Sequence, residues 1–276
     1  MTLGVSTLDN QPLVERAVAD LGGRRASRLR EKFLVDGKRR DEHAIQFFNP
    51  IWIETLGSPA ECAEEPVERE VRVPASRHCS LAERGQRASA MAVGERIYLR
   101  PFASGDGRHV AELSLRETEV VFPEGRWVVN ADAVDRYNQM ITRADLPDQV
   151  GLAIVLRESD ELIGVMAVFS IDWVHRTAET ASEIFRPEYR GGGYGTEAKH
   201  LLLEFAFDQL GLHMVYSSVS ESNPRSAAAL RKQGYRFAGY TAWTSFVASG
   251  LCGNWALDML ASEWRDALDR NQRGNA

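Results

Sequence analysis

The stretch "RPEYRGGGYGTEAKHLLLEFAF", residues 186–207, places four glycines within five positions and then turns abruptly into a helical pattern. Because glycine loses more conformational freedom on folding than any other residue, such a cluster indicates that another group approaches the backbone closely. Apolar residues follow the glycines at three- and four-residue spacing, so we expect a helix that begins near Tyr194 and buries one face. That face consists of Ala198, Leu201, Leu202, Phe205, Ala206 and Leu210.

A glycine turn at the start of a helix favours an anion, because the first N–H groups of the helix and its dipole point toward the turn. Two phosphate-binding motifs do not fit. A P-loop needs Lys and then Ser or Thr after its last glycine, whereas Gly195 is followed by Thr196 and Glu197. A GxGxxG fingerprint from Gly191 or Gly193 needs glycine at position 196 or 198, and threonine and alanine stand there.

The composition excludes several classes of function. The chain has 276 residues, 44% hydrophobic and 26% charged, with a net charge of −6, which is typical of a globular protein without a nucleic-acid footprint. No run approaches the roughly 18 apolar residues of a membrane span. The three cysteines are isolated and the six histidines form no ligand pair. We therefore expect a cytoplasmic protein without a metal, a membrane partner or a nucleic-acid partner.

The chain divides into three predicted segments. Residues 1–58 are expected to form a partly helical extension, because apolar positions recur at helical spacing over residues 13–21 and a glycine pair follows. Residues 59–94 are polar with three prolines, and we interpret them as a linker or loosely ordered arm. Residues 95–270 carry alternating strand and helix patterns, which predict one α/β or α+β domain.

Within the third segment, the pattern predicts individual elements. A strand is expected at 96–102, a helix at 130–144 and a hairpin around Asp160. Further strands are expected before the glycines, at 213–220 and in two late segments, and a helix closes the domain. Asn223 and Pro224 predict the start of a short helix that ends before Gly234.

The order of motifs resembles that of the GNAT superfamily of N-acetyltransferases. The series from Arg190 to Gly195 matches the Arg-x-x-Gly-x-Gly loop that binds the acetyl-CoA pyrophosphate, and "PEYRGGGYGTEA" looks more specifically like the RimJ/RimL branch. "SNPRS", "LRKQGYRFAG" and "SEW" follow in the family's order, so the resemblance covers roughly residues 95–268. It implies a mixed, mostly antiparallel central sheet flanked by helices.

The resemblance also implies a cofactor site. Backbone N–H groups of the loop would bind the diphosphate of acetyl-CoA, the co-substrate. The segment around Phe185 would pair with the pantetheine, and Asn223, which is also a routine helix cap, would contact the cofactor. The implied binding residues are Phe185, Arg190, Gly191, Gly192, Gly193, Tyr194, Gly195, Thr196 and Asn223.

The catalytic residues are less well marked. Ser226 stands where RimL-like enzymes place a serine near the thiol leaving group, although it is also an ordinary third residue of a short helix. The family's usual glutamate falls on Thr180, with Glu179 adjacent and Glu183 closer to the loop. A bulge could restore Glu179, Glu183 could substitute for it, or water could serve as the base.

The resemblance implies an acetyl-CoA-dependent N-acetyltransferase that acts on a primary amine of a peptide or protein N-terminus or of a small molecule. The rival interpretation is a non-catalytic acyl-CoA sensor on the same scaffold, and a different acyl donor also stays open. The apolar segment "IQFFNPIWIETLG" (45–57) is expected to dock on the catalytic domain or on a second subunit, unless it belongs to a poorly ordered leader. A homodimer is left open.

Overall fold

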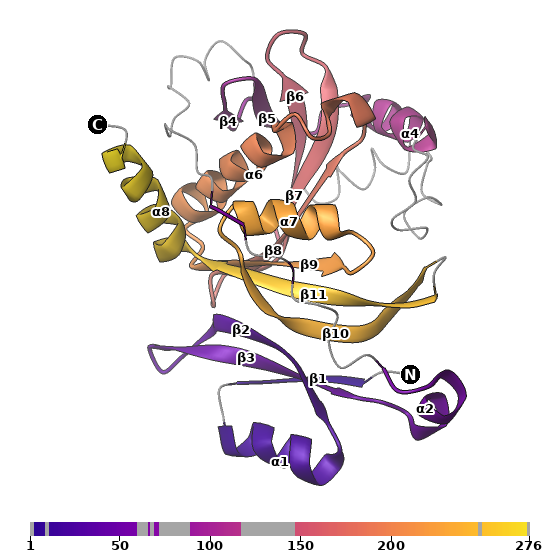
Figure 1. Cartoon of the computed structure of the whole chain (residues 1–276). Helices are drawn as coiled ribbons and strands as arrows, with labels where there is room; N and C mark the ends of the chain where they lie inside the picture. Colours follow the sequence, from indigo (N-terminus) through magenta and orange to yellow (C-terminus); the bar gives the residue numbers. More distant parts are fainter. Residues whose placement is uncertain are drawn as a thin grey trace. The chain divides into compact units, whose positions relative to one another are not determined.

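The computed structural model describes residues 3–8, 11–59, 66, 69–71, 89–116, 147–247 and 250–274. The chain forms two compact units, each built from two segments of the sequence. Figure 1 labels their helices and strands. The first unit consists of Met1–Val71 with Met214–Trp264, and the second consists of Arg72–His213 with Arg265–Ala276.

The second unit carries a sheet of antiparallel strands in the order β4-β5-β6-β7-β8. The strands are β4 (Ala92–Val93), β5 (Ile97–Pro101), β6 (Val150–Leu156), β7 (Leu162–Asp172) and β8 (Thr177–Ile184). β6 reads "VGLAIVL" and is buried at five consecutive positions. Such a continuous apolar run is typical of a strand with both faces covered.

Helices cover this sheet. α4 (Asp106–Arg116) packs on β7, and α6 (Tyr194–Glu204) packs against β5 and β8. α6 directs Ala198, Leu202 and Leu203, all fully buried, into the core. It is preceded by a 3-10 turn, η2 (Pro187–Tyr189), and continues into a π-helical turn, η3 (Phe205–Gln209).

The first unit carries strands in the order β1-β3-β2-β10-β11-β9, and every pair described is antiparallel. β1 (Leu3–Leu8), β2 (Arg24–Val35) and β3 (Lys38–Phe47) come from the N-terminal segment. β9 (Met214–Ser220), β10 (Arg236–Val247) and β11 (Gly250–Leu260) come from the C-terminal segment. The two groups of strands meet where Ser27 of β2 pairs with Gly239 of β10.

The helices of the first unit are short. α1 (Gln11–Leu21) packs on β3, and α7 (Pro224–Lys232) packs on β9. α2 (Pro50–Leu56) begins at Asn49, whose side chain accepts a hydrogen bond from the N–H of Ile51. The last helix, α8 (Ala261–Gly274), contains the division between the units, which falls after Trp264.

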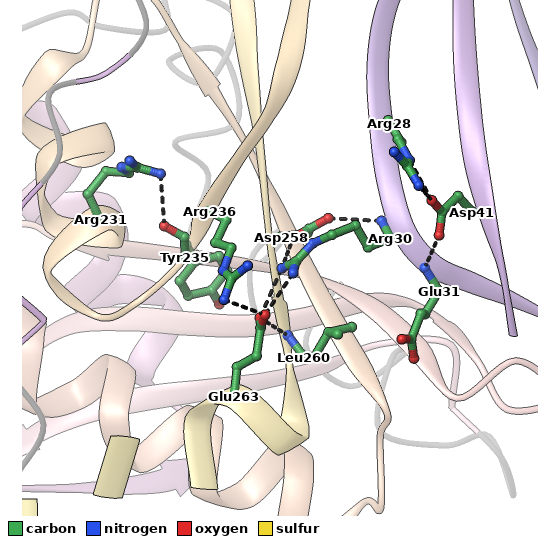
Figure 2. Close-up of polar contacts among 10 residues, drawn as sticks. All are labelled: Arg28, Arg30, Glu31, Asp41, Arg231, Tyr235, Arg236, Asp258, Leu260 and Glu263. Carbon is green, nitrogen blue, oxygen red and sulfur yellow. Dashed lines mark hydrogen bonds and ion pairs between the residues drawn. The ribbon is translucent and has the colours of Figure 1, made fainter. Parts of the chain in front are cut away.

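A partly buried ionic cluster joins β2 to the C-terminal segment within the first unit (Figure 2). The Arg30 guanidinium donates to Asp258, which is 1% exposed, and to Glu263 at 2.7 Å. Burial raises the pKa of Asp258 despite the opposing charge of Arg30. At Glu263 burial also acts to raise the pKa, but the hydrogen bond and charge of Arg30 outweigh it and lower the pKa. Arg236 adds a second cation at Glu263, 2.8 Å away.

Most expected elements of residues 95–270 are present at the expected places. The mixed, mostly antiparallel sheet flanked by helices is confirmed, as is the hairpin around Asp160 and the helix capped by Asn223. The helix predicted at 130–144 and most of the linker predicted at 59–94 lie outside the described residues. The three-segment division of the chain stays a prediction.

The N-terminal segment is partly helical, as expected, and it also contains strands that were not predicted. α1 and α2 are helices, but residues 24–47 form the long strands β2 and β3. These strands are difficult to predict from the sequence. Register shifts between Arg25 and Ser27 and between Leu29 and Phe33 break the alternation of inward and outward side chains that marks a strand. Ile45 of the apolar segment is buried in this unit, whereas Ile51, Trp52 and Leu56 on α2 remain exposed.

Candidate active site

The glycine-rich turn forms the N-terminus of α6, in the second unit. Gly191 and Gly193 adopt positive φ angles of 80° and 89°, which only glycine takes up without strain. Gly193 is the N-cap residue and offers no side chain to the first N–H groups of the helix. These groups belong to Tyr194, Gly195 and Thr196, and they have no partner within the helix itself.

Arg96, immediately before β5, holds the turn in place. Its guanidinium donates to the carbonyl of Gly192 at 2.8 Å and lies 4.3 Å from the centre of the Tyr194 ring. The same side chain donates to Glu197 in the first turn of α6, at 2.9 Å, and the N–H of Arg96 donates to the other carboxylate oxygen at 2.8 Å. Glu197 also leaves no room for a side chain at Gly94, where a Cβ would lie 2.4 Å from it.

Arg96 and Glu197 support the turn, and neither residue was predicted from the sequence. They are 101 residues apart, so no local pattern connects them. One signal was present, because an acidic residue in the first turn of a helix that is expected to bind an anion needs a compensating cation. Arg96 provides that cation.

The segment before the glycines is anchored as well. Arg186 pairs with Glu161 of the β6–β7 turn, and the Tyr189 hydroxyl donates to the same carboxylate at 3.2 Å. The Tyr189 ring meets the Tyr194 ring edge to face at 5.4 Å. The turn is therefore held from both sides, which reduces the ordering that a ligand must impose when it binds.

The structure gives Arg190 and Phe185 supporting contacts. The Arg190 side chain donates to the carbonyls of Ile184 at 2.9 Å and Phe185 at 3.1 Å, and its N–H donates to the carbonyl of Pro187. The N–H of Phe185 donates to the carbonyl of Ile163 at 3.0 Å. In these contacts the Arg190 side chain and the Phe185 backbone stabilise the end of β8. Their role as cofactor-binding residues stays a prediction.

β8 presents the two candidate carboxylates on one face. Glu179 and Glu183 are four residues apart on the strand, so they point the same way, and Thr180 points to the opposite face. Glu179 is half-buried, Glu183 is exposed and Thr180 is 3% exposed. β8 pairs in regular register with β7 from Ile184 back to Glu179, and the bulge lies beyond Glu179. A bulge that moves Glu179 to the face of Thr180 is therefore not present in this pairing.

Ser226 and Asn223 lie in the first unit, at the start of α7. The Asn223 side-chain oxygen accepts the N–H of Ser226 at 3.1 Å, which is the expected capping bond. Ser226 is half-buried at the third position of the helix. The cap is confirmed, while the roles of Asn223 at the cofactor and of Ser226 at the sulfur stay predictions.

The turn leaves room for an anion at its backbone. A Cβ at Gly191 would meet no atom within 4 Å, and one at Gly195 would meet only the Ile184 side chain at 3.7 Å, so the approach to the backbone is open. An anion is the ligand that an uncapped helix N-terminus favours.

Within the described residues, His, Cys, Asp and Glu form no group of three or more that could hold a metal ion. Nor does any described helix have the length and apolar character needed to cross a membrane.

Comparison with known proteins agrees with this geometry. Residues 96–236, about half of the chain, match the family model described as acetyltransferase (GNAT) domain. A candidate ribosomal N-acetyltransferase of Bacillus subtilis, YdaF, is 28% identical over 149 residues, which cover 52% of this chain and 79% of that protein. The spermidine N(1)-acetyltransferase of Vibrio cholerae is 29% identical over 86 residues, 31% of this chain and 49% of that protein.

The fold has solved counterparts. A structure of spermidine N-acetyltransferase from Vibrio cholerae in complex with CoA and spermine has a TM-score of 0.56 and 20% identity. The alignment covers 62% of this chain and 98% of that one. On the family match and the turn described above, the chain belongs to the GNAT acetyltransferase family and is an N-acetyltransferase with acetyl-CoA as its acetyl donor.

Proposed function

We propose that this chain transfers the acetyl group of acetyl-CoA to a primary amine, either at a peptide or protein N-terminus or on a small molecule. The observation that supports the donor half is the uncapped N-terminus of α6, where Gly193 leaves the first N–H groups of the helix open to an anion. Bound acetyl-CoA would supply a thioester. The residues of the chain would hold the cofactor and accept the proton that the amine loses.

The acceptor half rests on the carboxylate face of β8. An amine must lose a proton before it attacks, and α-amino groups with a pKa near 8 need less help than alkyl amines near 10.4. Glu179 and Glu183 face the same way, and either one would attract a cationic amine and accept its proton, directly or through water. Ser226 is proposed to donate a hydrogen bond to the departing thiolate, and Asn223 to contact the cofactor while it caps α7.

The relationship to the RimJ/RimL branch is also part of this proposal. It is supported by the sequence "PEYRGGGYGTEA" and by the similarity to a candidate ribosomal N-acetyltransferase, and it favours a peptide or protein N-terminus. The similarity to a spermidine N(1)-acetyltransferase favours a small polyamine.

The function is tested by thiol release from acetyl-CoA in the presence of amines from both classes. The panel contains peptides with free N-termini, polyamines, amino acids and aminoglycosides, and mass spectrometry of the product identifies the acetylated nitrogen. We expect acetylation of one class and CoA binding in the absence of an acceptor. CoA binding without turnover on any amine would instead support a sensor, and the absence of CoA binding would refute the proposal.

A further inference from the structure

A lysine side chain is buried behind the candidate carboxylates. Lys199 lies on α6, one turn beyond the glycine-rich turn, and is 2% exposed. Its Nζ donates to the Thr180 hydroxyl of β8 at 3.2 Å. A lysine is almost never fully buried unless its charge or its hydrogen bonds are satisfied. This contact therefore ties the helix that carries the proposed diphosphate site to the strand that carries Glu179 and Glu183.

The charge that acts on Lys199 comes from β8. Burial lowers the pKa of the Lys199 amine from 10.5 to about 7, and the negative charge of Glu179 opposes that shift. The influence is mutual, because a protonated Lys199 favours the ionised form of Glu179 by the same interaction. Below about pH 7 Lys199 carries its charge, so it acts on Glu179 throughout the range in which a glutamate ordinarily titrates.

Several other titratable groups near α6 and β8 have partners of their own. On β5, Tyr98 donates to Asp160 and Arg100 pairs with Asp106. Arg96, before β5, pairs with Glu197. Asp172, at the end of β7, lies near His175, and Arg176, before β8, donates to the carbonyl of Gly211. On α6 itself, His200 follows Lys199 and is buried, and opposite Glu179 on β7 stands Phe169, which carries no charge.

We propose that Lys199 is a positioning residue for acetyl transfer: it fixes β8 against α6 through Thr180 and keeps Glu179 in its carboxylate form. This inference rests on the proposed function, in which Glu179 is a candidate for the group that accepts the proton of the amine. Lys199 touches neither the cofactor nor the acceptor in this role, because it acts from the face of β8 that carries Thr180. Its contribution is to make one carboxylate of the strand available as a base.

The direct test is the titration of Glu179 followed by the carboxyl carbon signals of ¹³C-glutamate, with Glu179→Gln to assign the signal. Lys199→Met keeps the length and apolar stem of the side chain but removes its charge. We expect the pKa of Glu179 to rise by about one unit in this variant, the size of one charge interaction across a strand. Lys38→Met is the matched control, because Lys38 is exposed at the start of β3, and it should leave the signal unchanged.

A second variant separates the inference from a general loss of packing. Thr180→Val keeps the shape of the side chain and removes the hydroxyl that holds the ammonium, so we expect a smaller shift in the same direction. The acid limb of kcat/KM should move to higher pH in Lys199→Met by the same amount. Unchanged Glu179 titration in both variants would overturn the role of Lys199. The NMR titration needs no turnover, so a failure of the proposed function, seen as absent CoA binding, is a separate result.

Discussion

Gly195 combines two properties that make it a sharp probe of the anion site. It is the second residue of α6, where the helix dipole stabilises a negative side chain by about 0.3–1 kcal/mol. A side chain there also has room, because the nearest atom to a Cβ would be in ordinary contact at 3.7 Å. An acidic residue at this position should therefore preserve the fold while it repels a bound anion.

We predict that Gly195→Asp weakens CoA binding about a hundredfold relative to Gly195→Asn. The two side chains have the same shape, and a like charge about 5 Å from a diphosphate costs roughly 3 kcal/mol at a partly exposed site. Calorimetry with CoA measures the affinities, and thermal unfolding should show Gly195→Asp to be at least as stable as Gly195→Asn. Equal affinities of the two variants would place the diphosphate elsewhere.

At the scale of elements, one close approach joins the N-terminal strands to the rest of the first unit. β2 meets β10 at Gly239, whose φ is 139°, and a Cβ there would lie 2.2 Å from the carbonyl oxygen of Ala26 and 2.5 Å from the Cα of Ser27. Both of these atoms belong to the backbone, so neither can move without separating the strands. A glycine is required here by distance as well as by conformation.

Gly239→Ala is therefore expected to destabilise the first unit by at least about 3 kcal/mol, which combines a backbone clash with a disfavoured φ. Gly250→Ala is the matched control, because its φ is also positive at 114° but nothing lies within 4 Å of its Cβ. That variant should lose only about 1 kcal/mol from backbone strain. Urea unfolding compares the two, and similar losses would mean that β2 does not lie this close to β10.

At the scale of the whole molecule, the ionic cluster of Figure 2 joins residues that are 228 positions apart in the chain. Arg30 donates from its side chain and from its backbone N–H to Asp258. Breaking a buried ion pair leaves an uncompensated charge, which costs more than the intact pair contributes. The N-terminal segment is thus part of the first unit because of a specific contact as well as strand pairing.

We expect Arg30→Met to lower the free energy of unfolding by roughly 3–5 kcal/mol, because Asp258 would stay buried without its cation. Arg16→Met, which breaks an exposed ion pair with Asp20 one turn away on α1, should cost less than about 1 kcal/mol. The double variant Arg30→Met with Asp258→Asn should recover part of the loss. Equal effects of the Arg30 and Arg16 variants in chemical unfolding would contradict the burial of Asp258 in the cluster.

Local patterns were sufficient for much of the second unit and for the end of the first. The glycine turn, the start of α6 at Tyr194 and the Asn223 cap depend on residues within a few positions of one another, so the sequence alone predicts them. β2 and β3 were not predicted, because bulges interrupt their alternation and because Arg30 pairs with a distant partner, Asp258.

The sequence by itself determined the family, the donor and the turn that is proposed to bind it, because these depend on local backbone chemistry and on an ordered series of short motifs. Only the tertiary structure decided that Arg96 and Glu197 hold that turn, that Lys199 lies buried behind Glu179, and that Arg30 reaches Asp258. Each of these contacts joins side chains far apart in the chain. Their energies depend on burial and distance, which a one-dimensional pattern does not contain.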